Sequence, residues 1–182
     1  MTPEPRTAAP ERALERETVG LRIQVVSGIG FGPTKLAAFD AALREAGIAD
    51  RNLVHLSSII PPGSEIVVAH DGEPAAAPGR WGDRLYVVIA DLRVDTRYEE
   101  AVAGLGWVQE ERSGRGLFCE HVGHTEREVR RDILATLSSL SNGRPQTFGP
   151  PQVVVRNTVC AGEPTCAGPD RPPESPPRIT SL

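Results

Sequence analysis

Two carboxylates stand at positions where the surrounding pattern predicts apolar side chains. Glu120 follows the apolar run 117–119 in a predicted strand. A carboxyl group that is partly buried there would have a raised pKa, which suits proton donation; a solvent-facing position on the polar side of a sheet is the plain alternative. Asp40 lies four residues after Leu36 and three before Leu43, so the three share one stripe of a predicted helix. Asp40 is either an acid within that stripe or a carboxylate at its margin that reaches water.

The adjacent serines Ser57 and Ser58 are the most informative feature of the chain. They interrupt an apolar segment that continues through residues 59–60 and ends in the Pro-Pro-Gly of 61–63. Proline cannot donate a hydrogen bond to a strand ladder, so the strand that carries the serines ends there. The packing of an apolar strand gives no reason for two hydroxyl groups, yet a Ser-Ser step is common and by itself indicates little.

Cys119, His121 and His124 have the close spacing typical of metal ligands. In a strand, Cys119 and His121 would point to the same face, and His124 would lie in the turn that follows. A structural zinc site needs four ligands, and the other cysteines, Cys160 and Cys166, lie in a segment predicted to be a tail. We therefore predict no metal site and interpret Cys119 as a small core residue.

The glycine-rich sequence GIGFGP at 28–33 lies between a predicted strand and a predicted helix, where phosphate-binding loops occur. A G-x-G-x-x-G loop would need glycine where Pro33 stands, and the G-x-x-x-x-G-K-[ST] pattern has no match. The glycines are interpreted as allowing a tight turn from strand to helix.

The elements that position these residues follow from alternating strand-like and helix-like patterns. Strands are predicted at residues 21–27, 52–60, 84–92, 101–109, 114–122 and 152–156. One helix is predicted after the N-cap Thr34, ending at Gly47. A second follows the capping box of Thr125 and Glu128, with an apolar face of Val129, Ile133, Leu137 and Leu140. Two amphipathic helices with five or six strands predict an α/β or α+β sandwich.

Composition excludes several classes of protein. The net charge of −4 and the few aromatic residues (Phe 4, Trp 2, Tyr 2) argue against nucleic-acid binding. No apolar run is long enough for a membrane helix or a signal peptide, and the odd cysteine count of 3 argues against a disulfide scaffold. We expect a soluble cytoplasmic protein that does not bind membranes. The predicted parts are a mobile arm at 1–20, a folded domain at 21–156 and a disordered, Pro-rich tail at 157–182.

Residues 28–63 resemble the signature of the pyruvoyl-dependent arginine decarboxylases. In that family a glycine loop, a T-x-L-x-A-F-D-x-A-L helix, an A-G-I turn and an N-L-V-x-x-S-S-I-x-P-P segment follow one another. This chain has GIGFGPTKLAAFDAALREAGIADRNLVHLSSIIPPG. The later sequence GRGLFCEH is similar to the family's G-L-[apolar]-x-E segment. The resemblance covers about residues 21–140, and the segment with the two serines is its most specific part.

The resemblance implies that the chain is a proenzyme that cuts itself between Ser57 and Ser58. The Ser58 hydroxyl would attack the Ser57 carbonyl, and β-elimination of the resulting ester would leave dehydroalanine. Hydrolysis with loss of ammonia would then give a pyruvoyl group at residue 58. Only a residue with a hydroxyl or thiol on Cβ can react in this way. Asn52 matches the asparagine that would polarise the reacting carbonyl; a turn residue at a strand edge is the alternative.

For turnover, the resemblance implies a Schiff base between the pyruvoyl group and L-arginine, which loses CO2 to give agmatine. Glu120 matches the catalytic acid that protonates the α-carbon, and Asp40 matches the aspartate that binds the guanidinium group. The aliphatic walls of the substrate site would be Leu36, Leu43 and Ile59. The covalent pyruvoyl group would be the cofactor, with no metal and no pyridoxal phosphate.

The family fold implied is a four-layer αββα sandwich of the α+β class. It would assemble as a homotrimer or larger, with active sites between subunits. Two alternatives remain open from the residues: a pyruvoyl decarboxylase for another amino acid, and an uncleaved, non-catalytic paralogue that serves as a structural or regulatory subunit. The joint presence of both serines, Asn52, Asp40 and Glu120 argues against the second.

Overall fold

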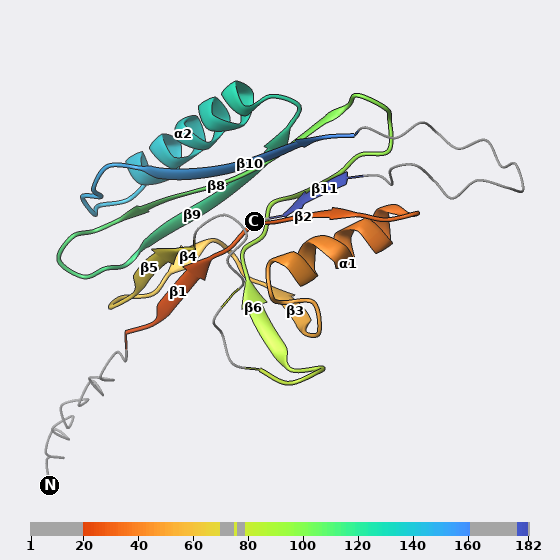
Figure 1. The fold of residues 1–182 in the computed structure, drawn as a ribbon. Helices are drawn as coiled ribbons and strands as arrows, with labels where there is room; N and C mark the ends of the chain where they lie inside the picture. The colour runs from red at the N-terminus through yellow and green to blue at the C-terminus, as the bar shows by residue number, and fades with distance from the viewer. Residues whose placement is uncertain (1–19, 70–74, 76–78, 161–177, 182) are drawn as a thin grey trace, which may run out of the picture.

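The computed structural model of the chain (Figure 1) describes residues 20–69, 75, 79–160 and 178–181, the last four through their backbone only. It contains two helices and several small sheets, and it is of the α+β class, as predicted.

The longest strands form an antiparallel sheet in the order β10-β8-β9-β4. Its members are β10 (Gln152–Val159), β8 (Glu100–Gln109), β9 (Gly116–Gly123) and β4 (Ile59–Ile60). In the β8–β9 hairpin, Leu105 lies opposite Glu120, and Ile59 of β4 pairs with Leu117 of β9. This pairing brings the residue before Ile59, which is Ser58, to the open edge of β9.

Helix α2 (Glu126–Asn142) covers one face of this sheet (Figure 1). It begins where Thr125 Oγ1 accepts a hydrogen bond from the Glu128 N–H at 3.2 Å, as the capping pattern predicts. Three members of its predicted apolar face are buried: Val129, Ile133 and Leu137. They pack against the sheet residues Val102, Val108, Leu117 and Cys119.

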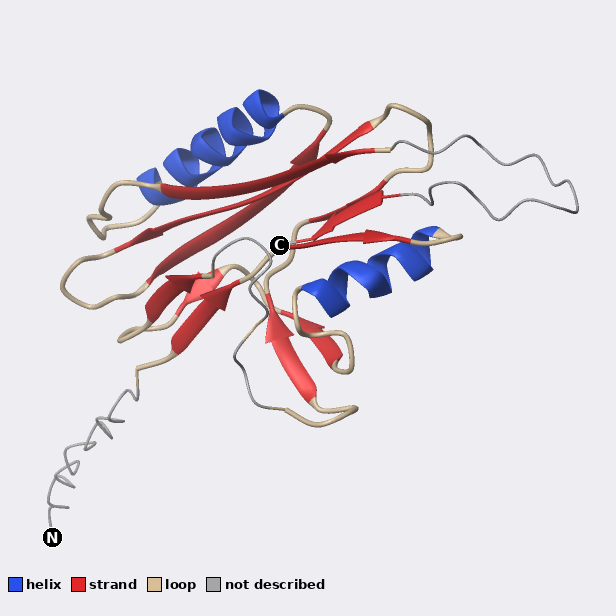
Figure 2. Cartoon of the chain, viewed as in Figure 1, coloured by secondary structure: helices blue, strands red, loops and turns tan. Residues whose placement is uncertain are grey.

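Smaller sheets lie on the side of the four-stranded sheet away from α2 (Figure 1). One consists of β2 (Gly28–Phe31), β11 (Arg178–Ser181) and β7 (Asp91–Arg93). Two parallel pairs are formed by β1 (Arg22–Val25) with β5 (Glu65–Val68) and by β3 (Asn52–His55) with β6 (Arg84–Val87). Helix α1 (Lys35–Glu45) packs on β2 and β11, so the two helices lie on opposite sides of the strands (Figure 2).

Helix α1 has the predicted caps. Thr34 Oγ1 accepts a hydrogen bond from the Ala37 N–H at 3.1 Å. At the other end Gly47 adopts a positive φ of 76°, a conformation that favours glycine, and reverses the chain after the last turn.

The glycines of β2 allow α1 to pack unusually close to the strand. A Cβ atom on Gly30 would lie 2.0 Å from the Ala38 carbonyl oxygen, and one on Gly28 would lie 2.1 Å from the Ala42 carbonyl oxygen. Ala38 and Ala42 are fully buried against this strand. Residues 28–31, which were predicted as part of a turn, therefore form a strand whose glycines are needed for helix packing.

The core between the four-stranded sheet and the smaller sheets is apolar. Its buried members come from β1, β4, the segment after β6, β8 and β9: Val25, Ile60, Ala90, Ala103, Leu105, Trp107 and Phe118. The rings of Trp107 and Phe118 pack with centroids 6.2 Å apart at a tilt of 60°.

Two predicted strands are broken in the structure. The segment 52–60 forms β3 and β4 with an irregular link at 56–58, and the segment 84–92 forms β6 and β7 with a link at 88–90. Strands β5 and β7 were not predicted as separate elements, because short partly buried strands have little periodicity of their own.

The predicted tail is wrong at both ends. Strand β10 continues to Val159, because β8 offers paired backbone positions as far as Glu100, and Cys160 after it is buried. Residues 178–181 form β11 between β2 and β7. Residues 1–19 of the predicted arm at 1–20, and the rest of the tail, 161–177 and residue 182, lie outside the described residues.

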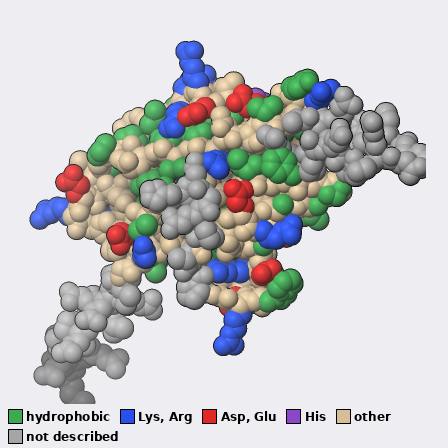
Figure 3. All heavy atoms as spheres, viewed as in Figure 1, with side chains coloured by type: hydrophobic (Ala, Val, Ile, Leu, Met, Phe, Trp, Pro, Cys, Tyr) green, Lys and Arg blue, Asp and Glu red, His purple; other side chains and the backbone are tan. Residues whose placement is uncertain are grey.

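Within the described part of the chain, neither helix is long and apolar enough to cross a membrane. On the face drawn in Figure 3, acidic and basic side chains are interspersed and do not form a large patch of one sign.

Candidate active site

The irregular link between β3 and β4 places Ser58 beside Glu120, although the two residues are 62 positions apart in the chain. The Ser58 hydroxyl donates a hydrogen bond to Glu120 Oε2 at 3.0 Å. The Ser58 carbonyl accepts a hydrogen bond from the Phe118 N–H at 2.9 Å, which continues the β4–β9 pairing by one residue. The nucleophile candidate is thus held at two points against β9.

The carbonyl group before Ser58 has its own donor. The Ile59 N–H donates to the Ser57 carbonyl oxygen at 2.5 Å, which closes a three-residue turn around Ser58. A hydrogen-bond donor at a carbonyl oxygen stabilises the negative charge that develops there when a nucleophile attacks its carbon. The Ser57–Ser58 peptide therefore has a proton acceptor on the hydroxyl and a donor on the carbonyl.

A groove of about 300 Å³ opens beside this peptide. On the strand side it is lined by Ser57, Ser58, Ile59 and residues 117–120 of β9. On the helix side it is lined by Thr136, Leu140 and Arg144, which follow one another at intervals of four residues and so share one face of α2 and the turn after it. Half of these residues are apolar, and apolar atoms form most of the groove's lining surface, which suits a site for a small organic ligand.

Glu120 is exposed in this chain, and it occupies the face of β9 that also carries Phe118. Phe118 is buried in the core between the sheets, whereas Glu120, two residues further on, lies beyond the edge of that core. The sequence left open that Glu120 faces solvent on the polar side of the sheet. Glu120 is indeed exposed to solvent, but it lies on the inner, apolar face of the sheet.

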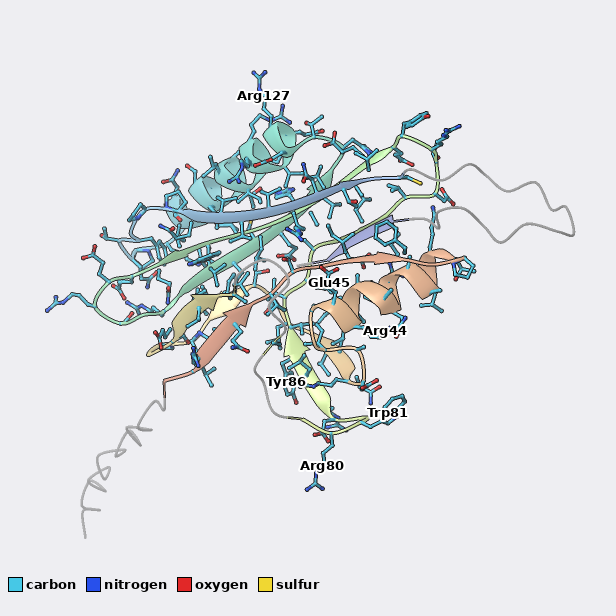
Figure 4. All side chains as sticks on the ribbon, in the orientation of Figure 1. Arg44, Glu45, Arg80, Trp81, Tyr86 and Arg127 are labelled. Atoms are coloured by element: carbon cyan, nitrogen blue, oxygen red, sulfur yellow. The ribbon has the colours of Figure 1, made fainter. Side chains whose placement is uncertain are left out.

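Asp40 does not lie in the groove of the same chain. Its side chain is exposed on α1 and pairs with Arg44 Nη2 at 3.2 Å. Figure 4 shows Arg44 projecting outward from α1, whereas the neighbouring Glu45 points to β2, where Glu45 Oε2 accepts a hydrogen bond from the Ile29 N–H. Within one chain the structure therefore separates Asp40 from Ser58 and Glu120.

The predicted apolar stripe of α1 is wrong. Leu36 is 69% exposed, Asp40 is exposed, and only Leu43 of the three is buried. The buried face is formed instead by Ala38, Ala42 and Leu43, because the helix lies so close to β2 that small side chains must face it. Leu43 packs in a cluster with Ala46 and Ile48. Of the three predicted aliphatic walls, only Ile59 lines the groove.

Asn52 lies at the first position of β3, while Ser57 and Ser58 follow the last. Its side-chain amide donates to the Gly82 carbonyl at 2.7 Å, and its backbone N–H donates to the Asp83 carbonyl. Because β3 is extended, Asn52 is not brought to the Ser57 carbonyl of the same chain. The donor found at that carbonyl is the Ile59 N–H.

The three candidate metal ligands have separate partners. Cys119 is buried under α2 with its sulfur 3.7 Å from the Ile133 carbonyl oxygen, His121 Nε2 is 2.8 Å from Thr136 Oγ1, and His124 Nδ1 is 2.9 Å from the Glu100 carbonyl oxygen. Burial raises the pKa of the Cys119 thiol to about 11. Among the described residues no three His, Cys, Asp or Glu side chains are grouped as a metal site would need.

The helix side of the groove was not predicted. Thr136 lies four residues before Leu140 and Arg144 four residues after it. Since Leu140 belongs to the predicted apolar face of α2, this spacing was the available signal.

Comparisons with known proteins point to a single family. The family model for pyruvoyl-dependent arginine decarboxylase matches residues 22–159. A protein of that name from Picrophilus torridus is 38% identical over 105 residues, which are 56% of this chain and 56% of the relative. Relatives of the same name from Methanococcoides burtonii and Methanopyrus kandleri are 35% identical over 125 residues (65% of this chain, 68% of the relative) and 56% identical over 55 residues (30% and 34%).

The chain thus spans little more than half the length of the Picrophilus relative. The family model, however, covers almost all of the folded part described above, including both serines and Glu120. The chain belongs to the pyruvoyl-dependent arginine decarboxylase family.

Proposed function

We propose that the chain is a proenzyme that cuts itself between Ser57 and Ser58 and then decarboxylates L-arginine to agmatine and CO2. The observation that carries the proposal is the Ser58 hydroxyl at 3.0 Å from Glu120 Oε2, with the adjacent Ser57 carbonyl bound by the Ile59 N–H. Nucleophile, proton acceptor and carbonyl donor are then present at one peptide bond.

Processing begins when Glu120 accepts the Ser58 Oγ proton and Oγ bonds to the Ser57 carbonyl carbon. The C–N bond breaks, the nitrogen takes a proton, and an ester links the two residues. Loss of the Ser58 α-proton expels residues 1–57 as a carboxylic acid and leaves dehydroalanine. One water then replaces the nitrogen, which departs as ammonia, and a ketone remains at residue 58. The Ile59 N–H would stabilise the oxyanion of the first step.

The residues around position 58 fit a pyruvoyl group, because the groove opens at this point and Glu120 lies beside it. Such a group supplies an acceptor for the electron pair that CO2 leaves on the α-carbon. In turnover Glu120 would donate a proton to that α-carbon. Ile59, Leu117 and Leu140 would exclude water from the aliphatic part of the substrate.

Recognition of the guanidinium group is proposed to come from Asp40 of a neighbouring copy of the chain. A carboxylate accepts the planar guanidinium fork well, but Asp40 lies outside the groove of its own chain. Homotrimers or larger assemblies with shared sites would bring the two together. We also propose that α2, the large sheet, the smaller sheets and α1 form the four layers of an αββα sandwich.

The pairing of Asp40 with Arg44 favours one second candidate, a pyruvoyl decarboxylase for a different amino acid. If Asp40 stays paired within its own helix, no described carboxylate of the groove other than Glu120 would bind a cationic side chain. A panel of amino acids given to the processed enzyme separates the two candidates.

The test of self-processing is the intact mass of the purified protein, with denaturing electrophoresis. We expect two chains, of residues 1–57 and 58–182, the second with a ketone at its N-terminus that carbonyl reagents label. Ser58→Ala should remain a single chain because it has no Oγ. Ser57→Ala, which keeps the nucleophile, is the matched control and should still be cut. A wild-type chain that decarboxylates arginine while uncut would contradict the mechanism.

A further inference from the structure

The groove beside Ser58 contains one permanently charged cation. Among the residues that line it, Glu120 has the carboxyl group and Arg144 the basic side chain, and Glu120 already accepts the Ser58 hydroxyl. The Cys119 thiol stays neutral because burial raises its pKa to about 11. The reaction proposed above does not use Arg144.

Arg144 is held but not neutralised. Its Nη1 donates to the Leu140 carbonyl at 2.7 Å, and its backbone N–H donates to the Ser141 carbonyl, so the turn after α2 fixes its direction. It is partly buried, and among the described residues no carboxylate lies within ion-pairing distance of it. A guanidinium group has five N–H donors, and a single carbonyl uses only one of them.

An amino acid that reacts at residue 58 brings a carboxylate into the same groove. Its α-amino nitrogen must reach residue 58, and its α-carboxylate is only two bonds from that nitrogen. An anion in a largely apolar groove needs a cationic or hydrogen-bonding partner. Arg144 is the lining residue able to provide both, through the planar fork that matches a carboxylate.

We propose that Arg144 binds the α-carboxylate of the incoming amino acid and orients it in the groove. The inference rests on the proposed function, because it assumes that a substrate binds covalently at residue 58. Arg144 would act in binding rather than in the chemical step, since a cation that stabilised the carboxylate strongly would oppose its departure. Its bond to the Leu140 carbonyl leaves it in place after CO2 has gone.

Arginine and agmatine are the matched ligands for the test, because they differ only in the carboxylate. In processed Arg144→Gln, we expect KM for arginine to rise about 10- to 100-fold, the effect of losing a hydrogen bond between charged groups. Inhibition by agmatine should be unchanged or stronger. Arg144→Lys, which keeps the charge but loses the fork, should be intermediate. Arg131→Gln removes an exposed arginine of α2 outside the groove and should resemble wild type.

A second readout avoids turnover. Borohydride reduces the ketone at residue 58 to a hydroxyl, and calorimetry of the reduced enzyme then gives Kd for both ligands. The expected result is a loss of arginine binding in Arg144→Gln without a loss of agmatine binding. Equal weakening of both ligands would show that Arg144 only caps α2 and would overturn the inference, as would unchanged arginine binding. Wild-type protein that is not cut, or does not convert arginine, would refute the proposed function instead.

Discussion

At the scale of single residues, Glu120 is the group with the most chemistry assigned to it. The sequence associated it with turnover alone, whereas the structure places it on the Ser58 hydroxyl. One carboxylate would then serve twice, first as the acceptor of the Ser58 proton and later as the donor to the substrate α-carbon. The two roles need opposite protonation states, which a carboxyl group can adopt in turn.

Glu120→Gln tests both roles. The amide can still accept a hydrogen bond from Ser58 but cannot take its proton, so cutting should be slower. In the fraction that is cut, kcat should fall by about 10²- to 10⁴-fold, the usual contribution of a general acid. The measurements are a time course of chain cleavage and a rate per cut chain. Glu111→Gln, an exposed position in the β8–β9 turn, is the control. Normal turnover in cut Glu120→Gln would assign the proton to another donor.

Cys119 illustrates a residue whose position removes its reactivity. Because burial raises the pKa of its thiol to about 11, only about 10⁻³ of it is thiolate at pH 8. We expect iodoacetamide to leave Cys119 unmodified in the folded protein at pH 8 and to modify it in denaturant, as measured by mass spectrometry of its peptide. Labelling in the folded state at the rate of a free thiol would show that α2 does not cover it.

At the scale of elements, contacts within a few residues could be predicted and longer ones could not. The caps by Thr34 and Thr125 depend on residues three positions away and were predicted correctly. The buried face of α1 depends on the close approach of β2, which the helix sequence does not encode by itself.

The site was predictable only in part, for the same reason. Ser58 and Glu120 could each be identified from a motif, but their contact requires β4 to pair with β9. The break at 56–58 was missed because apolar residues lie on both sides of the two serines, at Leu56 and at Ile59. The donor on the Ser57 carbonyl is a backbone group, so no residue type could reveal it.

The approach of α1 to β2 can be tested with Gly30→Ala, in a Ser58→Ala background that stays uncut. The added Cβ would lie 2.0 Å from the Ala38 carbonyl oxygen, so helix and strand must separate. We expect a loss of about 1–3 kcal/mol in the free energy of unfolding by urea. Gly143→Ala is the control, because its nearest atoms are 3.8 and 3.9 Å away. Equal stability of the two variants would contradict the packing described.

At the scale of the whole molecule, the separation of Asp40 from Glu120 makes a prediction about shared sites. Asp40→Asn and Glu120→Gln should each lower arginine kcat/KM strongly, the former by about 10- to 150-fold through loss of a charged hydrogen bond. In assemblies formed from equal amounts of both, some sites receive Asp40 from one chain and Glu120 from another.

Random mixing in a ring of subunits would restore about a quarter of the wild-type sites over all assemblies, and about a third in homotrimers that contain both variants. The measurement is the activity of co-expressed, differently tagged variants after purification on both tags. Activity no higher than that of the separate variants would show that each site is built from one chain.

The strand pairings also determine what becomes of the two pieces after cleavage. Residues 1–57 contain β1, β2 and β3, and their partners β5, β11 and β6 all follow the cut. Each of these three strands therefore has its ladder partner in the other piece. Cleavage would leave two interlocked polypeptides rather than a domain with a loose peptide.

Folding of the uncut chain is a unimolecular event, whereas the cut protein could regain its structure only by an encounter of two molecules. Mass action then applies: the unfolding midpoint of the processed protein should rise more steeply with protein concentration than that of Ser58→Ala. This strand topology requires folding to precede cleavage, because the paired strands belong to one polypeptide only until the chain is cut. Self-cleavage would irreversibly convert a chain that can refold by itself into a two-chain protein whose folded fraction depends on its own concentration.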